Sequence, residues 1–350
     1  MTDSHRSGFV CLVGRPNVGK SSLLNRLVSS KVAIVSDKPQ TTRHAVRGIL
    51  TLPEAQIVFV DTPGLHRPRD ALGRRLNDVA RDSLRDVDEI LFVLDASERI
   101  GAGDAFIARA LSEGGSGGVA AFRGTGARRA RSCDPPEESE GGSGGVAAFR
   151  GTGARRARSC DPPEESEVST PVICVVTKAD LVTPPELLAQ IEAARALGNW
   201  QDVLTTSSTR GTGVPDVVRA LVEGLPEGPQ YYPPEAVSDQ PQALAVSEII
   251  REKVLELLAE EVPHSVAVVV DEIEPGEAPD VLFVQASVYV ERDSQKGIVI
   301  GKGGRMLREI GSRARPDVEA LLGSRVFLQL RVRVEPSWPR REGLLERFGY

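Results

Sequence analysis

The sequence predicts two domains in one chain, a doubly wound and mostly parallel α/β sheet followed by a smaller α+β domain. Apolar segments of strand length alternate with segments of helical periodicity as far as residue 223. A proline-rich stretch, residues 226–241, then indicates a linker. After residue 243 the expected order changes to helix, two strands, two helices and a strand. A chain of 350 residues is long enough to bury two separate cores.

Each expected element of the first domain rests on its apolar pattern and on the glycines and prolines beside it. In chain order we expect a strand, loop and helix over 8–29, strands at 45–52 and 56–61, a loop and helix over 62–86, a strand at 89–95, a helix at 102–111, a strand at 171–176, a helix at 184–197, a strand at 202–206 and a helix at 214–223. The domain boundaries that follow are 1–225, a linker at 226–242, a second domain at 243–340 and a tail at 341–350.

One segment of the first domain has no core pattern. Residues 114–140 and 141–167 are identical copies of 27 residues, rich in Gly, Ser and charge. Such a composition cannot bury enough apolar surface to offset its ordering entropy, so we expect a disordered surface insertion. An exact repeat favours a duplication; the alternative is an RNA contact through arginines such as Arg128 and its copy Arg155.

Composition excludes several classes of protein. Net charge is −6, and 26% of residues are charged and 40% hydrophobic, which is ordinary for a globular protein. The apolar runs are too short to cross a bilayer, and the first residues lack a signal-peptide pattern, so we expect a cytoplasmic protein. The four cysteines form neither a zinc pattern nor a disulfide framework.

The most specific motif is GRPNVGKS, residues 14–21, which fits G-x-x-x-x-G-K-[S/T] between an expected strand and helix. Backbone N–H groups in such a loop form a concave anion site at a helix N-terminus. Lys20 would reach the β- and γ-phosphates of a nucleotide, and Ser21 would bind Mg²⁺. The alternative is a glycine-rich turn with no ligand.

Two later motifs define the nucleotide. Asp61 ends an expected strand and begins Asp-Thr-Pro-Gly, so that Asp61 would hold Mg²⁺ and the N–H of Gly64 would sense a γ-phosphate. Asp180, in Thr-Lys-Ala-Asp after another strand, would accept hydrogen bonds from N1 and N2 of guanine. Adenine lacks that donor pair. The segment Thr206–Ser208 would close over the base.

Four elements in this order, GRPNVGKS, DTPG, TKAD and TSS, resemble the signature of translation-factor-class GTPases. The segment DKPQTTRH, residues 37–44, and the C-terminal third resemble one family of that class, the Era GTPases. The resemblance implies a P-loop GTPase domain followed by a type II KH domain, with GTP or GDP and Mg²⁺ as ligands. The nucleotide contacts it implies are Gly14, Asn17, Val18, Gly19, Lys20, Ser21, Ser22, Thr42, Asp61, Gly64, Thr177, Lys178, Asp180, Ser207 and Ser208. The metal ligands it implies are Ser21, Thr42 and Asp61, with Thr41 the alternative to Thr42.

The resemblance also bears on hydrolysis. Ras-like proteins orient the attacking water with a glutamine after the DxxG glycine, but this chain has Leu65 there. Relatives with an apolar residue at this place often carry the asparagine that Asn17 matches, which helps to bind K⁺. We therefore expect slow intrinsic turnover and no catalytic role for Arg43. Thr177 and Ser208 depart from the family's usual asparagine and alanine, and Thr177 predicts weaker guanine binding.

In the second domain, GKGG at residues 301–304 matches the G-x-x-G loop that clamps RNA backbone in KH domains. A helix-start turn is the alternative. Charge favours RNA: residues 239–294 hold thirteen acids and three bases, whereas residues 295–341 hold eleven bases and four acids. The expected RNA-binding residues are Gly301, Lys302, Gly303, Gly304, Arg305, Arg308 and Arg313.

The resemblance finally implies function: an Era-like GTPase, monomeric, that binds the 3′ end of 16S rRNA and acts in assembly of the 30S subunit, with association at the inner face of the cell membrane. Two alternatives stay open. One is a nucleotide-gated RNA-binding module or chaperone with negligible hydrolysis. The other is a P-loop ATPase or kinase, which would need adenine selectivity despite Asp180.

Overall fold

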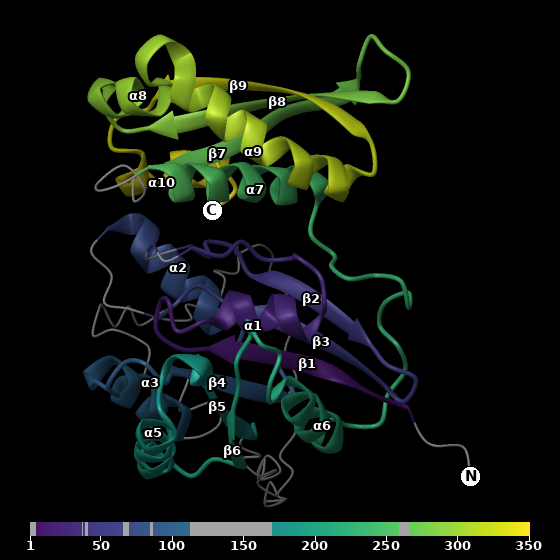
Figure 1. The fold of residues 1–350 in the computed structure, drawn as a ribbon, viewed down its shortest axis with the longest axis vertical. Helices are drawn as coiled ribbons and strands as arrows, with labels where there is room; N and C mark the ends of the chain where they lie inside the picture. The colour runs from purple at the N-terminus through teal and green to yellow at the C-terminus, as the bar shows by residue number, and fades with distance from the viewer. Residues whose placement is uncertain are drawn as a thin grey trace, which may run out of the picture.

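The computed structural model describes residues 5–36, 38, 41–65, 70–84, 87–112, 170–258 and 266–350. They form two domains, one above the other in Figure 1. The duplicated segment at 114–167 lies outside the described residues, so the structure does not test the prediction that it is disordered.

The first domain contains a six-stranded sheet with the strand order β2-β3-β1-β4-β5-β6. Only β2 is antiparallel to its neighbour. The strands are β1 (Arg6–Val13), β2 (Val46–Thr51), β3 (Ala55–Asp61), β4 (Glu89–Asp95), β5 (Val172–Thr177) and β6 (Asp202–Thr205). The helices are α1 (Lys20–Leu27), α2 (Ala71–Asp82), α3 (Ala102–Ser112), α5 (Pro184–Leu197) and α6 (Val214–Gly224), with a short 3₁₀ turn, η1 (Ala179–Leu181). This doubly wound arrangement is the fold class that the alternating pattern predicts.

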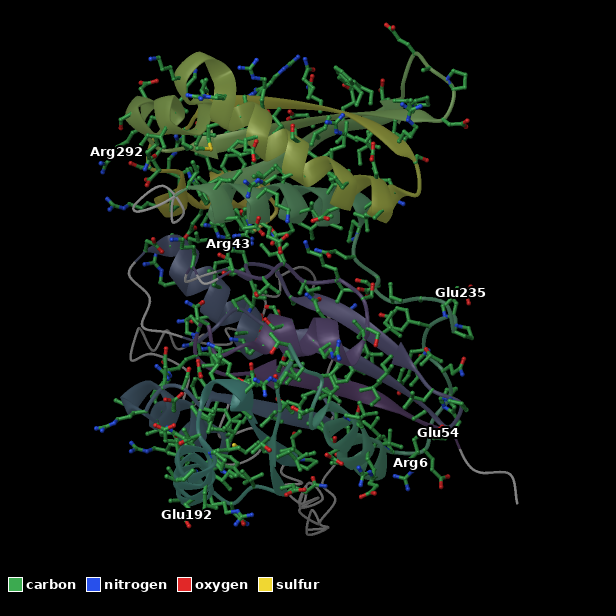
Figure 2. The ribbon with its side chains drawn as sticks, viewed as in Figure 1. Arg6, Arg43, Glu54, Glu192, Glu235 and Arg292 are labelled. Atoms are coloured by element: carbon green, nitrogen blue, oxygen red, sulfur yellow. The ribbon has the colours of Figure 1, made fainter. Side chains whose placement is uncertain are left out.

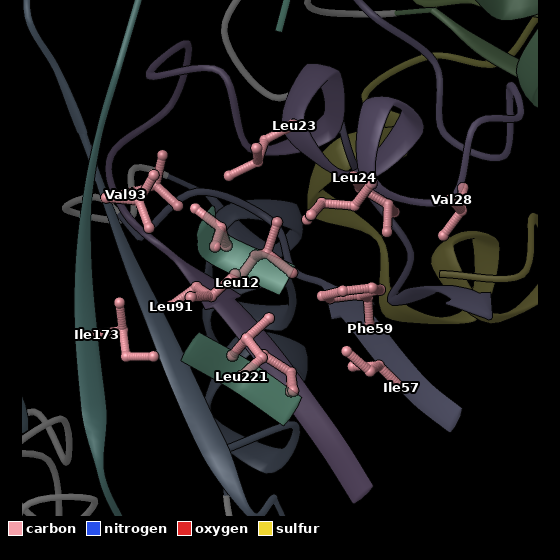
Figure 3. Close-up of a cluster of buried hydrophobic side chains, with 14 of the residues drawn as sticks. Leu12, Leu23, Leu24, Val28, Ile57, Phe59, Leu91, Val93, Ile173 and Leu221 are labelled. Carbon is pink, nitrogen blue, oxygen red and sulfur yellow. The ribbon is translucent and has the colours of Figure 1, made fainter. Parts of the chain in front are cut away.

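Helices cover both faces of this sheet because successive strand residues point to opposite sides. Leu12 of β1 packs under α1 and α6 with Leu24 and Leu221, as Figure 3 shows. Its neighbour Cys11 faces the other way, into a second cluster with residues of α3 and α5. The phosphate loop leaves the carboxyl end of β1, where ligands of doubly wound sheets bind.

The second domain is a three-stranded sheet, ordered β7-β8-β9, covered on one face by helices. β8 runs antiparallel to β7 and parallel to β9. Its elements are α7 (Gln242–Leu257), β7 (Ala267–Pro275), β8 (Val281–Val290), α8 (Asp293–Ile300), η3 (Lys302–Gly304), α9 (Arg305–Leu322) and β9 (Arg325–Val334). The sequence pattern put both helices after GKGG, but the structure places α8 before it. The α8 segment is short and contains serine and glycine, so its helical pattern is weak.

Residues 341–350 were expected to form a tail, but they fold back onto the protein. Beyond β9 come η4 (Trp338–Arg340) and α10 (Glu342–Arg347). Trp338 and Leu345 are fully buried, in one cluster with Leu72 and Leu76 of α2. The second domain and its last residues therefore pack against the first domain.

The proline-rich linker lies along the first domain rather than away from it. The N–H groups of Tyr231 and Tyr232 donate to Gln56 Oε1 at 2.7 and 2.9 Å. The amide of Ile49 donates to Val237 O at 2.9 Å, and Arg47 pairs with Asp239 at 2.8 Å.

Candidate nucleotide and RNA sites

The phosphate loop has the backbone that an anion site requires. Asn17 and Gly19 have φ angles of 65° and 97°, and Lys20 is the first residue of α1. A Cβ on Gly14 would lie 2.4 Å from the carbonyl oxygen of Val93, so this position requires glycine. The side chain of Val18 is buried, and Ser22 follows in α1. The predicted phosphate contacts from Gly14 to Ser22 therefore lie in one loop and the helix turn behind it.

Lys20 is held in the loop by backbone carbonyls. Its Nζ donates to Gly14 O at 3.1 Å and to Arg15 O at 2.9 Å. Burial lowers the pKa of Lys20 to about 8, against a smaller opposing effect of Asp61. A bound phosphate would restore the charged form, because an adjacent anion favours the ammonium.

Three predicted metal ligands converge beside Lys20. Ser21 Oγ donates to Asp61 Oδ2 at 2.6 Å, and Thr42 Oγ1 lies 2.9 Å from Ser21 Oγ and 3.2 Å from Asp61 Oδ2. The other carboxylate oxygen, Asp61 Oδ1, is buried with no hydrogen-bond partner among the described residues. Burial raises the pKa of Asp61, which Lys20 partly opposes. Two hydroxyls and a carboxylate are the hard oxygen donors that suit Mg²⁺.

Thr41, the alternative ligand, faces elsewhere. Its hydroxyl is 2.5 Å from the carbonyl oxygen of Lys38 and 3.2 Å from that of Ser36. The structure thus places Thr42, and not Thr41, in the oxygen cluster.

The residues after Asp61 approach the phosphate loop closely. A Cβ on Gly64 would lie 2.6 Å from Pro16 N, so a side chain there would collide with the loop. Leu65 is buried in the apolar cluster on the α3 and α5 side of the sheet. Its side chain therefore neither reaches the phosphates nor orients a water.

The guanine-recognition segment is tied to the phosphate loop. Thr177 Oγ1 lies 2.5 Å from Val18 O and 2.9 Å from Leu94 O. Lys178, with φ of 57°, pairs with Asp95 at 2.6 Å and donates to Asn17 O at 3.0 Å. Asp95 was not singled out from sequence; its signal is its place at the carboxyl end of β4.

Asp180 is partly exposed beside the segment 206–208. Its carboxylate accepts a hydrogen bond from Thr209 Oγ1 at 3.1 Å, and the Ser207 side chain, with that bond, lowers the pKa of Asp180. The amide of Ala179 donates to Thr206 O at 3.1 Å, which joins the two base-recognition segments. Ser207 is fully buried and Ser208 partly exposed. The carboxylate that the sequence predicts as the acceptor for guanine is therefore accessible and ionised at neutral pH.

Some of these groups line one pocket between the phosphate loop and the segment that precedes β2. It is lined by Pro16, Asn17, Gly19, Lys20, Ser21, Ser22, Ile34, Val35, Ser36, Thr41, Thr42, Gly64 and Lys178. Asn17 and Lys178, which are 161 residues apart in sequence, thus meet at a single edge of the sheet.

The GKGG loop joins α8 to α9 at the surface of the second domain. Gly301, Gly303 and Gly304 have φ angles of 69°, 62° and 74°, a region that favours glycine. A Cβ on Gly303 or Gly304 would meet nothing within 4 Å, so a ligand backbone has room to approach. Lys302 and Arg305 are exposed.

Two of the expected RNA-binding arginines have partners within the protein. Arg308 donates to Gly303 O at 3.0 Å and so braces the loop from α9. Arg313 is exposed and pairs with Glu309 at 2.7 Å, one turn away. Lys302 and Arg305 are therefore the nearer cations for a phosphate at the loop.

Comparison with known proteins identifies both domains. Residues 9–118 match the model of the 50S ribosome-binding GTPase family, and residues 261–339 match that of the KH domain. A variant of Aquifex aeolicus Era bound to GDP·AlF₄⁻ is similar over 99% of both chains, with 34% identity and a TM-score of 0.80. Era in complex with MgGDPNP and nucleotides 1506–1542 of 16S ribosomal RNA is also 34% identical over 99% of both chains, with a TM-score of 0.79. With a nucleotide pocket in the first domain, a KH fold in the second and this similarity throughout, the chain belongs to the Era family of GTPases.

Proposed function

We propose that this GTPase binds the 3′ end of 16S rRNA through the GKGG loop and uses its nucleotide state to control that binding during assembly of the 30S subunit. The observation that carries the proposal is the similarity, over 99% of both chains, to an Era solved with 16S rRNA nucleotides 1506–1542. The exposed glycine loop beside Lys302 and Arg305 supports it, because a KH loop holds RNA by close backbone approach.

The nucleotide would be held by the groups that converge on the pocket. Lys20 and the loop amides would bind the β- and γ-phosphates, and Gly64 N–H would approach the γ-phosphate. Ser21, Thr42 and Asp61 would hold Mg²⁺, which neutralises charge on the β- and γ-oxygens. Asp180 would accept the N1 and N2 protons of guanine, and Ser207 and Ser208 would close over the base.

Slow hydrolysis is part of the proposal because Leu65 is buried in the apolar core and cannot orient water. Asn17, in the phosphate loop beside the pocket, is the residue we propose as a K⁺ ligand. The same burial of Leu65 favours the second candidate, a nucleotide-gated RNA-binding module whose hydrolysis is negligible.

The small subunit is proposed although the family model for residues 9–118 is described by the 50S subunit. That model covers the nucleotide domain alone, whereas the match to the 16S complex includes the KH domain. Within the described residues, none of the helices is both long and apolar enough to span a bilayer. A cytoplasmic site of action, a monomeric state and peripheral attachment to the membrane complete the proposal.

The test measures GTP turnover with and without a 16S 3′-end RNA, in K⁺ and in Na⁺. We expect slow turnover that RNA and K⁺ each increase. A duplex RNA of equal length is the matched control for the ligand. Turnover that neither RNA nor K⁺ changes would favour the gated module, and equal affinity for a sequence-scrambled RNA would contradict the 16S assignment.

A further inference from the structure

Arg43, next to the proposed Mg²⁺ ligand Thr42, is buried between the two domains, where Figure 2 labels it. Its Nη1 donates to Val266 O at 2.7 Å and to the Tyr350 hydroxyl at 3.1 Å. Its guanidinium lies 5.6 Å from the ring centroid of Trp338 and 5.5 Å from that of Tyr350. Each of these partners belongs to the KH domain or to the residues that follow it.

Thr41, on the other side of Thr42, is held from the same domain. Its carbonyl oxygen accepts a hydrogen bond from Arg251 Nη2, on α7. Arg251 is fully buried, and Glu248 fixes its orientation by accepting from Nε at 2.8 Å and by pairing with Nη2. The chain on both sides of Thr42 is thus attached to the second domain.

Further contacts bring the same surfaces together. Lys31 pairs with Glu252 at 2.6 Å and with Asp317 at 2.9 Å, and Glu252 also accepts from the amide of Val35 at 2.9 Å. The His44 ring stacks on Tyr350 with centroids 4.9 Å apart. Lys31, Val35 and His44 are therefore in contact with α7, α9 and the C-terminal residues.

A metal ligand on a loop needs support, because the loop must hold its oxygen within a fraction of an ångström of the productive position. Within its own domain, the Thr42 hydroxyl contacts Ser21 and Asp61. Burying the Arg43 cation is costly unless hydrogen bonds and aromatic faces replace its water. The aromatic residues 338 and 350 supply that environment only when the domains are packed as seen here.

We propose that Arg251 and Tyr350 are positioning residues of the GTPase reaction: through Thr41 and Arg43 they hold the Thr42 hydroxyl where it completes the Mg²⁺ site. Neither residue touches nucleotide or metal. The KH domain and residues 338–350 then support the Mg²⁺ site of the other domain from outside, and Arg43 serves as an anchor rather than as a catalytic group.

The proposal predicts an effect on Mg²⁺ affinity in the presence of GTP but not of GDP. Thr42 joins the Mg²⁺ shell only when a γ-phosphate is present to share the ion, as in the ordering of GTPase switches. Loss of the two positioning residues should therefore weaken Mg²⁺ bound with GTP and leave Mg²⁺ bound with GDP unchanged. A merely structural role would instead lower the melting temperature and weaken both nucleotides together.

The experiment measures the Mg²⁺ concentration for half-maximal binding of a non-hydrolysable GTP analogue and of GDP, in the full chain. Arg251→Met should raise the requirement with the GTP analogue roughly tenfold, and the milder Tyr350→Phe about threefold, as expected for one hydrogen bond each. Tyr350→Phe keeps the ring and its packing, so it tests the proposal even if Arg251→Met folds poorly.

The matched control is Arg75→Ala. It removes an exposed ion pair between Arg75 of α2 and Glu346, which belongs to residues 338–350, and it leaves residues 41–43 untouched. It should behave as wild type. Equal Mg²⁺ requirements for wild type and both test variants would overturn the proposal, as would a parallel loss of GDP. Binding of either nucleotide by the variants at saturating Mg²⁺ shows that the GTPase assignment itself is intact.

Discussion

The hydroxyl oxygen of Thr177 lies 2.5 Å from the carbonyl oxygen of Val18, across 159 residues of sequence. This contact joins the base-recognition segment to the phosphate loop, which is the task of the asparagine that the family usually carries there. Thr177 also approaches Leu94 O at 2.9 Å, and its single proton can serve only one carbonyl at a time. The contact is therefore present, although threonine makes it through a shorter side chain than asparagine. The expectation that Thr177 weakens guanine binding stays a prediction.

Replacing Thr177 tests that tie. Thr177→Val keeps the shape and removes the proton, so GTP and GDP should both bind about three- to tenfold more weakly. Thr177→Ser, which keeps the hydroxyl, is the control and should lose less. Calorimetric titration with both nucleotides measures the effect; identical affinities for the valine and wild-type proteins would mean that the contact is incidental.

Lys20 predicts how nucleotide affinity depends on pH. Because burial lowers its pKa to about 8 without a nucleotide, and a bound phosphate would raise it, GTP binds to the protonated form. Affinity should be level below roughly pH 7 and fall, by up to about tenfold per pH unit, as pH rises past the pKa. Titrations of GTP from neutral to alkaline pH measure this slope. Lys20→Ala should bind GTP on the order of 100-fold more weakly and show no such slope.

Asp180 predicts base specificity. Asp180→Asn should exchange preference from GTP to XTP, because xanthine has a carbonyl where guanine has its 2-amino group and an amide can donate to it. Competition between the two nucleotides against a fluorescent GDP measures the change. Asp202→Asn, at an exposed position on β6, is the control and should keep the preference for GTP. An Asp180→Asn protein that still prefers GTP would show that this carboxylate does not read the base.

The buried carboxyl group of Glu89 should make the stability of the folded protein depend on pH. Both of its carboxylate oxygens are buried without a hydrogen-bond partner among the described residues, and burial, with Asp88 adding to it, raises its pKa to about 8. A raised pKa in the folded state means that the contribution to stability is complete below the ordinary pKa of 4.5 and is lost as pH rises through about 8.

Between about pH 4.5 and pH 8, Glu89→Gln should therefore lose less thermal stability than wild type, by a few degrees of melting temperature, and above pH 8 the two curves should run parallel. Scanning calorimetry at several pH values measures the difference. Glu192→Gln, at an exposed position on α5, is the control. Curves for Glu89→Gln and wild type that are parallel below pH 8 as well would mean that the carboxyl group is solvated.

The nucleotide pocket could be predicted because its signals are local. The phosphate loop, Asp61 and Asp180 each follow an apolar strand, and parallel strands bring their carboxyl ends to one edge. The interdomain contacts could not be predicted in this way. Arg43 and Tyr350 are 307 residues apart, and neither periodicity nor a motif relates them. Because no local pattern relates residues 341–350 to the first domain, the sequence predicts a tail there. In the structure Leu345 and Phe348 are buried against the first domain.

The GKGG loop supplies the last prediction. Lys302→Asp with Gly303→Asp should leave GTP affinity unchanged and sharply weaken RNA binding, because two carboxylates would place bulk and negative charge where the phosphates approach. Aspartate tolerates the left-handed backbone of Gly303 better than most residues, so the fold should survive. Filter binding with the 16S 3′ end, across a salt series, measures the loss, and single-stranded RNA should bind better than duplex.

Arg313→Ala is the comparison variant. Because Arg313 is a peripheral cation already paired with Glu309, its loss should weaken binding of all RNAs alike and reduce the salt slope by about one unit or less. If the double variant binds the 16S 3′ end as wild type does, the loop is only a turn between α8 and α9, and the RNA site lies elsewhere on the protein.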